Sequence, residues 1–211
     1  MYGPPTQQEE QLALQKGYKL IAGIDEVGRG PLAGPVVAAA VILSPRADVP
    51  WLGDLRDSKQ LTAKKREVLH KQILAEAPAV GVGISSSLSI DTYGIVKATK
   101  MAMVQAVENL PFPPGFLLID AVHLDEAGIP YKAIIHGDAL CCSIAAASIV
   151  AKVTRDWLMA KLDETYPGYG FAKHKGYGTR EHLDCLERLG PSPIHRRCFA
   201  PLRQPSLDLR P

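Results

Sequence analysis

The sequence has few cysteines, no long apolar run and little net charge. Only four of its 211 residues are cysteines, and two of these, Cys141 and Cys142, are adjacent, which does not fit the disulfide framework of a small secreted protein. No apolar stretch approaches the ~18 residues that span a bilayer. Residues 7–11 are too polar for a signal peptide. We therefore expect a soluble, cytoplasmic protein that does not bind membranes.

The net charge of +2 conceals an uneven distribution. Residues 171–211 carry eight Lys or Arg and four Asp or Glu, so that residues 1–170 are slightly acidic. A basic part beside an acidic part suits a protein that binds an anionic polymer together with cations. Solvated charges on an exposed helix would give the same counts, so composition alone leaves the partner open.

The length and the 46% hydrophobic content match one globular domain with a substantial core. We expect this domain over residues 17–165, followed by a C-terminal loop and helical region over 166–202. Residues 1–16 and 203–211 are expected to be flexible termini.

The apolar pattern predicts strands that alternate with helices. A loop rich in Pro, Asp and Gly is expected over 44–60. The order of the elements predicts an α/β fold in which helices flank a mixed central sheet, with a small helical C-terminal region. The predicted strands are 18–25, 36–43, 79–88, 116–120 and 131–135, and the predicted helices are 61–76, 89–109, 139–165 and 179–189.

Acidic residues lie where the predicted strands end. Asp25, Asp120 and Asp138 each end or closely follow a strand, and Glu26 comes directly after Asp25. Because sites assemble at strand ends of an open α/β sheet, these acids are candidate neighbours. A ligand set of carboxylates without Cys or His suits hard ions such as Mg²⁺. Two such ions ~4 Å apart stabilise the attacking and the leaving oxygen of a phosphoryl displacement. Consecutive strand residues point to opposite faces, so Asp25 and Glu26 converge only if the strand ends or bulges there.

Each acid taken alone is equally compatible with a helix cap, a turn residue or a solvated charge. The prediction therefore rests on their combination. Asp156 is excluded, because it lies 18 residues beyond Asp138 on one predicted helix, which corresponds to ~27 Å at ~1.5 Å per residue. We expect Asp156 to pair with Arg155 or Lys152 instead.

Four motifs follow one another along the chain: Asp-Glu-Val-Gly-Arg-Gly-Pro-Leu-Ala-Gly-Pro at 25–35, Asp-Ser-Lys at 57–59, the small-residue segment 143–156, and His-Lys-Gly-Tyr-Gly-Thr at 174–179. Together they resemble the ribonuclease HII family, over about residues 18–202. Several motifs in one order are far more specific than a single glycine pattern. The resemblance implies a ribonuclease H-like fold.

The resemblance also implies an activity. Members of this family are endoribonucleases that cut the RNA strand of RNA/DNA hybrids. They also cut on the 5′ side of a ribonucleotide embedded in duplex DNA, leaving 3′-hydroxyl and 5′-phosphate ends by a two-metal-ion mechanism. The implied catalytic and metal-binding residues, which would hold two Mg²⁺ or Mn²⁺ ions, are Asp25, Glu26, Asp120 and Asp138.

The same resemblance implies how the substrate is held. The partners would be RNA/DNA hybrids and DNA duplexes that contain ribonucleotides, bound by a monomer. Side-chain-free positions around Arg29 permit close approach to the 2′-hydroxyl that distinguishes RNA from DNA, and Tyr177 would lie against the sugar of the next nucleotide. Lys59, Lys175 and Arg180 are candidate phosphate contacts. The alternative is that they are ordinary basic side chains on the surface. The residues implied for 2′-hydroxyl recognition are Gly28, Arg29 and Gly30.

Two features depart from the family pattern. His136 stands where relatives often have lysine, and a histidine there either tunes the site with pH or has no role, which we favour. Cys198 creates the spacings His182-x-x-Cys185 and His195-x-x-Cys198, which superficially suggest zinc. Half of this pattern lies on a predicted helix and the family needs no structural metal, so we do not expect zinc.

Other function classes are weaker. The glycines at 28–34 resemble a dinucleotide-binding loop, but a strand rather than a helix follows them. A nucleic-acid-binding module of the same fold without catalysis, or another two-metal nuclease or nucleotidyl transferase, stays an alternative. The retained acids favour an enzyme, and the Gly-Arg-Gly and Lys-Gly-Tyr-Gly motifs argue against another nuclease class.

Overall fold

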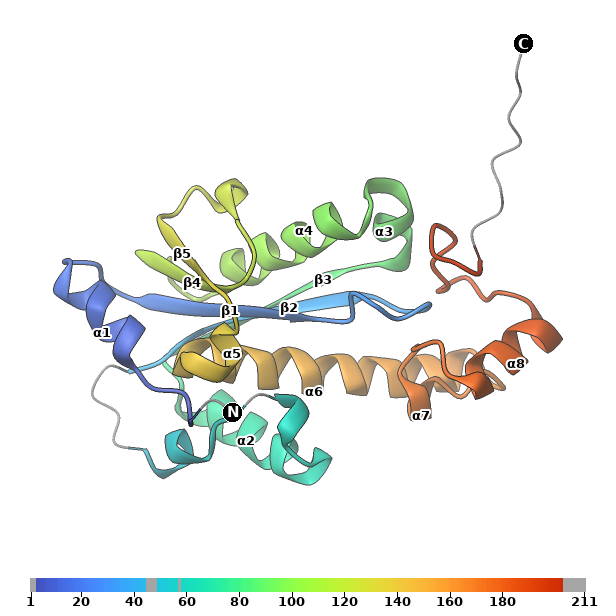
Figure 1. Cartoon of the computed structure of the whole chain (residues 1–211), viewed down its shortest axis with the longest axis horizontal. Coiled ribbons are helices and arrows are strands. Elements are labelled where there is room, and N and C mark those ends of the chain that lie inside the picture. The colour runs from blue at the N-terminus through green and yellow to red at the C-terminus, as the bar shows by residue number, and fades with distance from the viewer. Residues whose placement is uncertain (1–2, 45–48, 57, 203–211) are drawn as a thin grey trace, which may run out of the picture.

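The computed structural model describes residues 3–44, 49–56 and 58–202, and within η2 the side chain of Lys59 is outside the description. Five strands form one mixed sheet between layers of helices (Figure 1), which confirms the predicted α/β class. In chain order the strands are β1 Ile21–Val27, β2 Val36–Ile42, β3 Ala79–Ser85, β4 Phe116–Asp120 and β5 Tyr131–Ile134.

The helices surround this sheet. The α-helices are α1 Gln8–Gln15, α2 Ala63–Glu76, α3 Ser87–Tyr93, α4 Ile95–Glu108, α5 Gly137–Leu140, α6 Cys142–Thr165, α7 Phe171–His174 and α8 Arg180–Leu189, and the short 3-10 helices are η1 Pro50–Asp54, η2 Ser58–Gln60 and η3 Asp125–Ala127. No helix in the described part of the chain is both long and apolar enough to cross a membrane.

The strand order β3-β2-β1-β4-β5 places β1 at the centre of the sheet. β1 is antiparallel to β2 and parallel to β4, which in turn is parallel to β5. Ile24 of β1 pairs with Ile119 of β4, so Asp25 and Asp120 follow side by side at the carboxyl ends of two parallel strands. The central strand pair thus positions two of the predicted acids.

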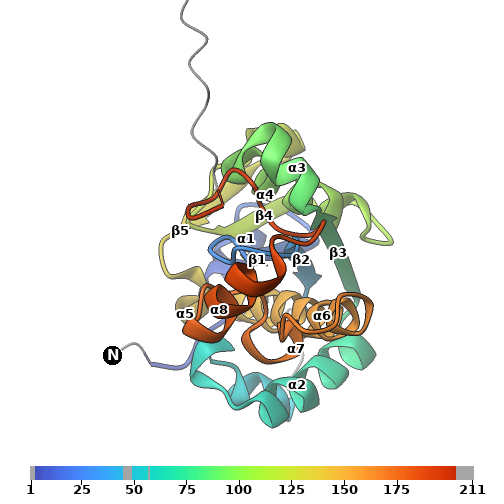
Figure 2. The ribbon, with the colours of Figure 1, turned by 90° about the vertical axis from the view of Figure 1, so that its right-hand side faces the viewer.

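Helices cover both faces of the sheet. α4 packs on one face, α6 on the other, and α2 lies against the outer side of α6 (Figures 1 and 2). Every residue of β2 is consequently buried, as expected for a strand with the apolar sequence Val-Val-Ala-Ala-Ala-Val-Ile. The close approach of α6 depends on Gly23 of β1, where a Cβ atom would overlap the backbone of Ser143.

Residues 8–15 form helix α1, within the stretch 1–16 for which the sequence predicted a flexible terminus. Helix α1 is anchored through Glu10, whose buried carboxylate accepts hydrogen bonds from the Ser143 backbone N–H at 2.8 Å and from the Cys141 thiol at 3.1 Å. The stretch is polar and only weakly amphipathic, so this attachment to the start of α6 leaves little trace in the sequence. The other expected flexible segment, 203–211, lies outside the described residues.

Two of the predicted helices are each divided in two. The helix expected over 89–109 begins earlier, because the Ser86 hydroxyl accepts the Ser89 N–H and caps α3. Gly94, with φ of +80°, then separates α3 from α4. The helix expected over 139–165 is likewise split, because the extended backbone of Cys141 separates α5 from α6.

The C-terminal region lies at one end of the sheet. Helices α7 and α8 follow the end of α6 and face the viewer in Figure 2. The region is attached to the loop between β1 and β2, because the Leu32 N–H donates to Gly176 O at 2.8 Å and the Arg196 N–H donates to Leu32 O at 2.8 Å. Ala33 and His195 form an isolated antiparallel bridge. The motif at 25–35 and the motif at 174–179 are therefore neighbours in space.

Candidate active site

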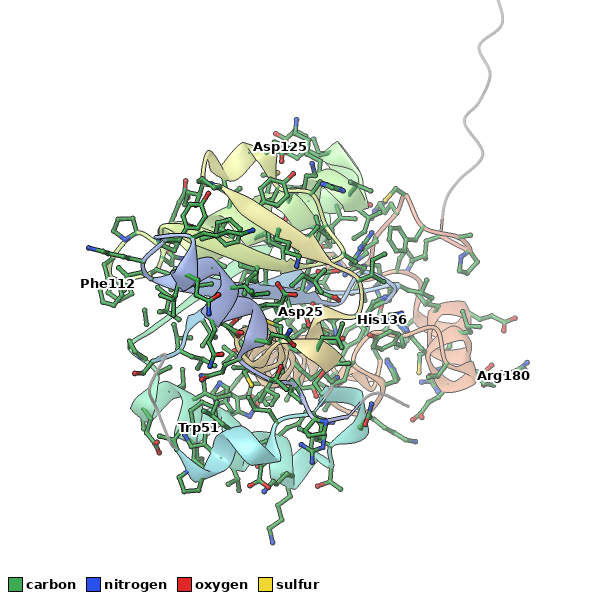
Figure 3. All side chains as sticks on the ribbon, turned by 60° about the vertical axis from the view of Figure 1, so that its left-hand side comes forward. Asp25, Trp51, Phe112, Asp125, His136 and Arg180 are labelled. Atoms are coloured by element: carbon green, nitrogen blue, oxygen red, sulfur yellow. The ribbon has the colours of Figure 1, made fainter. Side chains whose placement is uncertain are left out.

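Three of the predicted acids gather in one cluster. A carboxylate oxygen from each of Asp25, Asp120 and Asp138 lies within 4.8 Å of the other two. Figure 3 shows Asp25 near the middle of the molecule. The odd-numbered positions of β1 face α6, as the contact of Gly23 with Ser143 shows, and Asp25 follows the same alternation. The sheet register and this alternation together bring Asp25 and Asp120 to the same side.

The turn after β5 delivers the third acid. His136 has left-handed backbone dihedrals, φ 59° and ψ 37°, and Gly137 begins α5 directly after it. The Gly137 N–H donates to Asp120 Oδ1 at 2.7 Å, which orients that carboxylate and fixes the start of α5 beside β4. Asp138 therefore sits in the first turn of α5. A left-handed conformation is uncommon for a residue other than glycine, so the backbone of His136 shapes this turn, while the role of its side chain stays a prediction.

Glu26 lies beside the cluster, near enough for its charge to act on Asp25 and for the charge of Asp120 to act on it. β1 continues to Val27 in unbroken register, with Glu26 paired to Ala38, so the strand neither ends nor bulges at Asp25. Glu26 Oε1 accepts a hydrogen bond from Arg29 Nη1 at 3.2 Å. Glu26 Oε2 is buried without a hydrogen-bond partner. The geometry therefore groups three of the four predicted carboxylates and places Glu26 next to them.

Burial and mutual repulsion disfavour charge on these acids. Desolvation raises the pKa of Asp25 well above its usual value, and the charges of Glu26 and Asp120 raise it further. Hydrogen bonds from the Ser148 hydroxyl and the Glu26 N–H act in the opposite direction. Burial also raises the pKa of Glu26, although Arg29 opposes this.

A divalent cation would remove this electrostatic conflict. The donor set consists of carboxylate oxygens alone, which is the ligand type of Mg²⁺ and Mn²⁺. The buried Glu26 Oε2 has no hydrogen-bond partner, and such an atom is costly to bury unless something compensates it. The residues present therefore fit a hard divalent ion.

The two glycines of the Gly28-Arg29-Gly30 segment differ in the space beside their Cα atoms. Gly28 has φ of +94°, and a Cβ there would overlap the guanidinium of Arg155, so only glycine fits. At Gly30 a Cβ would meet nothing closer than the Tyr177 ring, at 3.9 Å. The space between the Gly30 backbone and the Tyr177 ring is thus open. Close approach of the backbone to a substrate requires such a space.

Two buried arginines hold the connection between β1 and β2, and sequence reasoning did not identify either of them as a support. Arg196 donates to the backbone carbonyls of Gly28, Arg29 and Gly34. Arg155 donates to the carbonyls of Pro35, Ala33 and Lys175. Both side chains have no exposed surface. A buried arginine that pairs with carbonyls has no charge pattern in the sequence to reveal it.

The remaining predicted substrate residues are more dispersed. The Tyr177 ring is 42% exposed and lies 5.9 Å from the Arg155 guanidinium carbon. Lys175 Nζ donates to Ala172 O. Arg180 lies on α8 at the outer edge of the molecule (Figure 3) and pairs with Asp184 at 2.9 Å. Lys59 lies in η2. The phosphate-contact roles of these three basic residues stay predictions.

The other sequence features are placed as follows. Asp156 pairs with Lys152 at 2.7 Å, which confirms its expected structural role. His182 and His195 lie together, but the Cys198 thiol points to the Ile90 carbonyl on α3. The four residues of the zinc-like spacing therefore divide between two places.

Comparison with known proteins gives one consistent result. A family model described as Ribonuclease HII matches residues 22–201. The chain is 55% identical to a ribonuclease HII of Dehalococcoides mccartyi over 94% of each chain, and 59% identical to one of Enterococcus faecalis over 93% of this chain and 75% of the relative. Among solved structures, the ribonuclease H2 of Pyrococcus horikoshii is similar with a TM-score of 0.73 and 29% identity, over 87% of this chain and 95% of that one.

Proposed function

Because the chain belongs to the ribonuclease HII family, whose members are metal-dependent endoribonucleases acting on the RNA strand of RNA/DNA hybrids, we propose that it also cuts duplex DNA on the 5′ side of an embedded ribonucleotide. The products would carry 3′-hydroxyl and 5′-phosphate ends. One observation carries this proposal: Arg29 pairs with Glu26 beside the carboxylate cluster, and the Tyr177 ring is the nearest group to the open position at Gly30.

We propose that Asp25, Glu26, Asp120 and Asp138 hold two divalent ions, Mg²⁺ or Mn²⁺. Bound in this way, the ions would supply an activated water and stabilise the leaving oxygen of the phosphodiester. The protein's own part is to orient the acids in advance. The Glu26 N–H holds Asp25 Oδ1 at 2.7 Å, and the Gly137 N–H holds Asp120 Oδ1 at 2.7 Å.

Ribonucleotide recognition is assigned to the Gly28-Arg29-Gly30 segment and Tyr177. The open backbone at Gly30 would let peptide groups reach a 2′-hydroxyl, which is the group that marks a ribonucleotide. The half-exposed Tyr177 ring would pack against the next sugar, where a 2′-hydroxyl would interfere with close contact. Cutting on the 5′ side of a ribonucleotide that is followed by DNA is the expected result.

Further aspects of this function remain predictions. Lys59, Lys175 and Arg180 are proposed to contact backbone phosphates, which position a duplex without reading its sequence. The division into a catalytic core over 17–165 and a substrate-binding region over 166–202, a monomeric state and a cytoplasmic location are proposed on the same basis.

A cleavage assay tests the proposed function. The substrate is an end-labelled DNA duplex with one ribonucleotide, compared with an all-DNA duplex of the same sequence and with a uniform RNA/DNA hybrid. We expect cutting of the single-ribonucleotide duplex with Mg²⁺ or Mn²⁺ and none with a chelator. Mapping of both product ends should place the cut directly 5′ of the ribonucleotide. Cleavage of the hybrid alone would contradict the proposal for embedded ribonucleotides.

A further inference from the structure

Three buried histidines lie under the turn that carries Tyr177. The rings of His174 and His182 are stacked, with centroids 4.4 Å apart and an interplanar angle of 17°. His182 Nε2 and His195 Nε2 are 3.0 Å apart. The edge of the Phe171 ring also meets His182 at 5.6 Å between centroids. The cluster has no role in the site described above.

The hydrogen bonds of the cluster determine the tautomer of His182 and His195. A carbonyl oxygen can only accept, so His182 Nδ1, 2.9 Å from Tyr177 O, carries the proton. Neutral His182 then has a lone pair on Nε2, and His195 must donate its Nε2 proton to it. His195 Nδ1 is left as an acceptor, and it receives the Ser192 N–H at 2.9 Å. The two rings form one directed chain of bonds.

The hydrogen bonds of His174 determine its tautomer in the same way. Its Nε2 lies 2.7 Å from Tyr169 O and therefore donates. Its Nδ1 accepts the Gly176 N–H at 3.2 Å. All three rings are thus satisfied in the neutral state. Burial lowers the pKa of His182 and lowers that of His195 to about 4, which agrees with this assignment.

The chain of bonds ends on the backbone of Tyr177. Tyr177 O accepts from His182 Nδ1–H and from the Thr179 N–H at 2.8 Å, and the Tyr177 N–H donates to His174 O at 3.0 Å. The two preceding residues, Lys175 and Gly176, both have positive φ, 54° and 82°. For Lys175, which carries a side chain, this conformation is uncommon and needs surrounding contacts to keep it in place. The ring of Tyr177 is half-exposed, so its direction depends on the backbone that carries it.

We propose that His182, neutral with its proton on Nδ1, is a positioning residue that sets the placement of the Tyr177 ring, and that His195 fixes the tautomer of His182. This inference rests on the proposed function, in which Tyr177 packs against the sugar after the ribonucleotide. His182 does not touch the substrate in this account. It acts through the Tyr177 carbonyl alone.

Two substitutions distinguish the role of Nδ1 of His182 from the role of Nε2. In His182→Asn the amide nitrogen lies near the position of Nδ1 and can still donate to Tyr177 O, whereas in His182→Gln the amide reaches the position of Nε2 and that donation is lost. The measured quantity is the ratio of kcat/KM for the single-ribonucleotide duplex to kcat/KM for the uniform hybrid. We expect His182→Gln to lower this ratio about tenfold, which corresponds to one hydrogen bond, and His182→Asn to leave it near the parental value.

The same pair of variants is then tested with Tyr177→Ala. His182→Gln should lower the ratio no further once the ring is absent, because the two residues act as one unit. The inference would be overturned if His182→Asn and His182→Gln lowered the ratio equally. It would also be overturned if His182→Gln still lowered the ratio in the Tyr177→Ala background.

A spectroscopic measurement tests the assignment in the parental protein, even where a variant does not fold. Histidine side-chain ¹⁵N NMR should show His182 neutral with its proton on Nδ1 and His195 neutral with its proton on Nε2 at pH 7. The opposite tautomer of His182, or its cationic form, would overturn the inference. A parent that cuts the hybrid but not the single-ribonucleotide duplex would contradict the proposed function instead, and the NMR result would still test the histidine arrangement.

Discussion

Asp25 is held where its charge is unfavourable. It is 6% exposed, and both its burial and the neighbouring Glu26 and Asp120 raise its pKa. A carboxyl whose pKa is raised in the folded state binds its proton more tightly there than in the unfolded chain. Stability therefore decreases as pH rises above the usual carboxyl value near 3.8. In the absence of metal, Asp25 destabilises the fold at neutral pH.

The variant Asp25→Asn should separate activity from stability. It removes a carboxylate from the cluster, so we expect the cleavage rate to fall about 1,000-fold or more. The same change removes a repelled charge, and the metal-free Tm should rise by a few degrees, since 1 kcal/mol corresponds to ~2–4 °C at this size. Calorimetry with a chelator measures Tm, and single-turnover cleavage measures the rate.

Asp156→Asn is the matched control, because it removes a carboxylate that pairs with Lys152 away from the cluster. It should cleave at a rate close to the parental one. Near-parental cleavage by Asp25→Asn, or a lower Tm of that variant without metal, would contradict this view of Asp25.

At the level of single residues, the sequence predicted the acids better than their supports. Asp25 and Asp120 end apolar runs and Asp138 closely follows one, and the structure brings the three carboxylates together. The direction of Glu26 could not be predicted, because it depends on whether β1 continues past Asp25. Arg155 and Arg196 were missed, since their partners are backbone carbonyls from distant segments.

At the level of elements, the site depends on how closely α6 approaches β1. Gly23 lies two residues before Asp25, and the backbone at Ser143 occupies the space where its side chain would be. A backbone cannot move aside as a flexible side chain can. The contact therefore fixes the start of α6 relative to the strand that carries Asp25.

We expect Gly23→Ala to lower the free energy of unfolding by about 3 kcal/mol through overpacking, and to reduce cleavage as α6 shifts. Gly53→Ala is the control, because a Cβ there meets nothing within 4 Å. That variant should be within ~1 kcal/mol of the parent, or slightly more stable. Urea unfolding of both variants measures the difference. Equal midpoints would show that the α6 contact is not tight.

The type of most elements could be predicted, and their ends less well. The strand at 36–42 is a uniform apolar run, and the strands at 21–27 and 116–120 begin with apolar runs that reach Asp25 and Asp120, a pattern that identifies buried strands. The division of the expected helix over 89–109 depends on one glycine conformation at Gly94. Helix α1 depends on the buried contact of Glu10 with α6, and a contact of that range has no local pattern.

At the level of the whole molecule, residues 169–195 are held to one another by neutral histidines that are sensitive to acid. Burial lowers the pKa of His195 to about 4 and also lowers that of His182, against ~6.5 in the unfolded chain. Between these values the unfolded chain binds more protons than the folded protein. Stability from these histidines is therefore fully present above about pH 6.5 and is lost as pH falls toward 4.

Replacement of His195 should reduce this acid sensitivity. Relative to the parent, His195→Asn is expected to lose less stability between pH 7 and pH 5, although it is less stable at pH 7 because a hydrogen bond is missing. His123→Asn, which changes an exposed histidine, should follow the parental pH dependence. Thermal unfolding at several pH values measures all three proteins. Identical pH dependence of His195→Asn and the parent would contradict the assignment.

We propose that carboxylates from β1, β4 and α5 hold divalent ions for phosphodiester hydrolysis. Anomalous diffraction from crystals soaked in Mn²⁺ tests it most directly, with Asp138→Asn crystals treated in the same way. We expect a Mn²⁺ peak bound by oxygens of Asp25, Asp120 and Asp138, and its loss or marked weakening in the variant. Density for Mn²⁺ at other residues only, or an unchanged peak in Asp138→Asn, would contradict it.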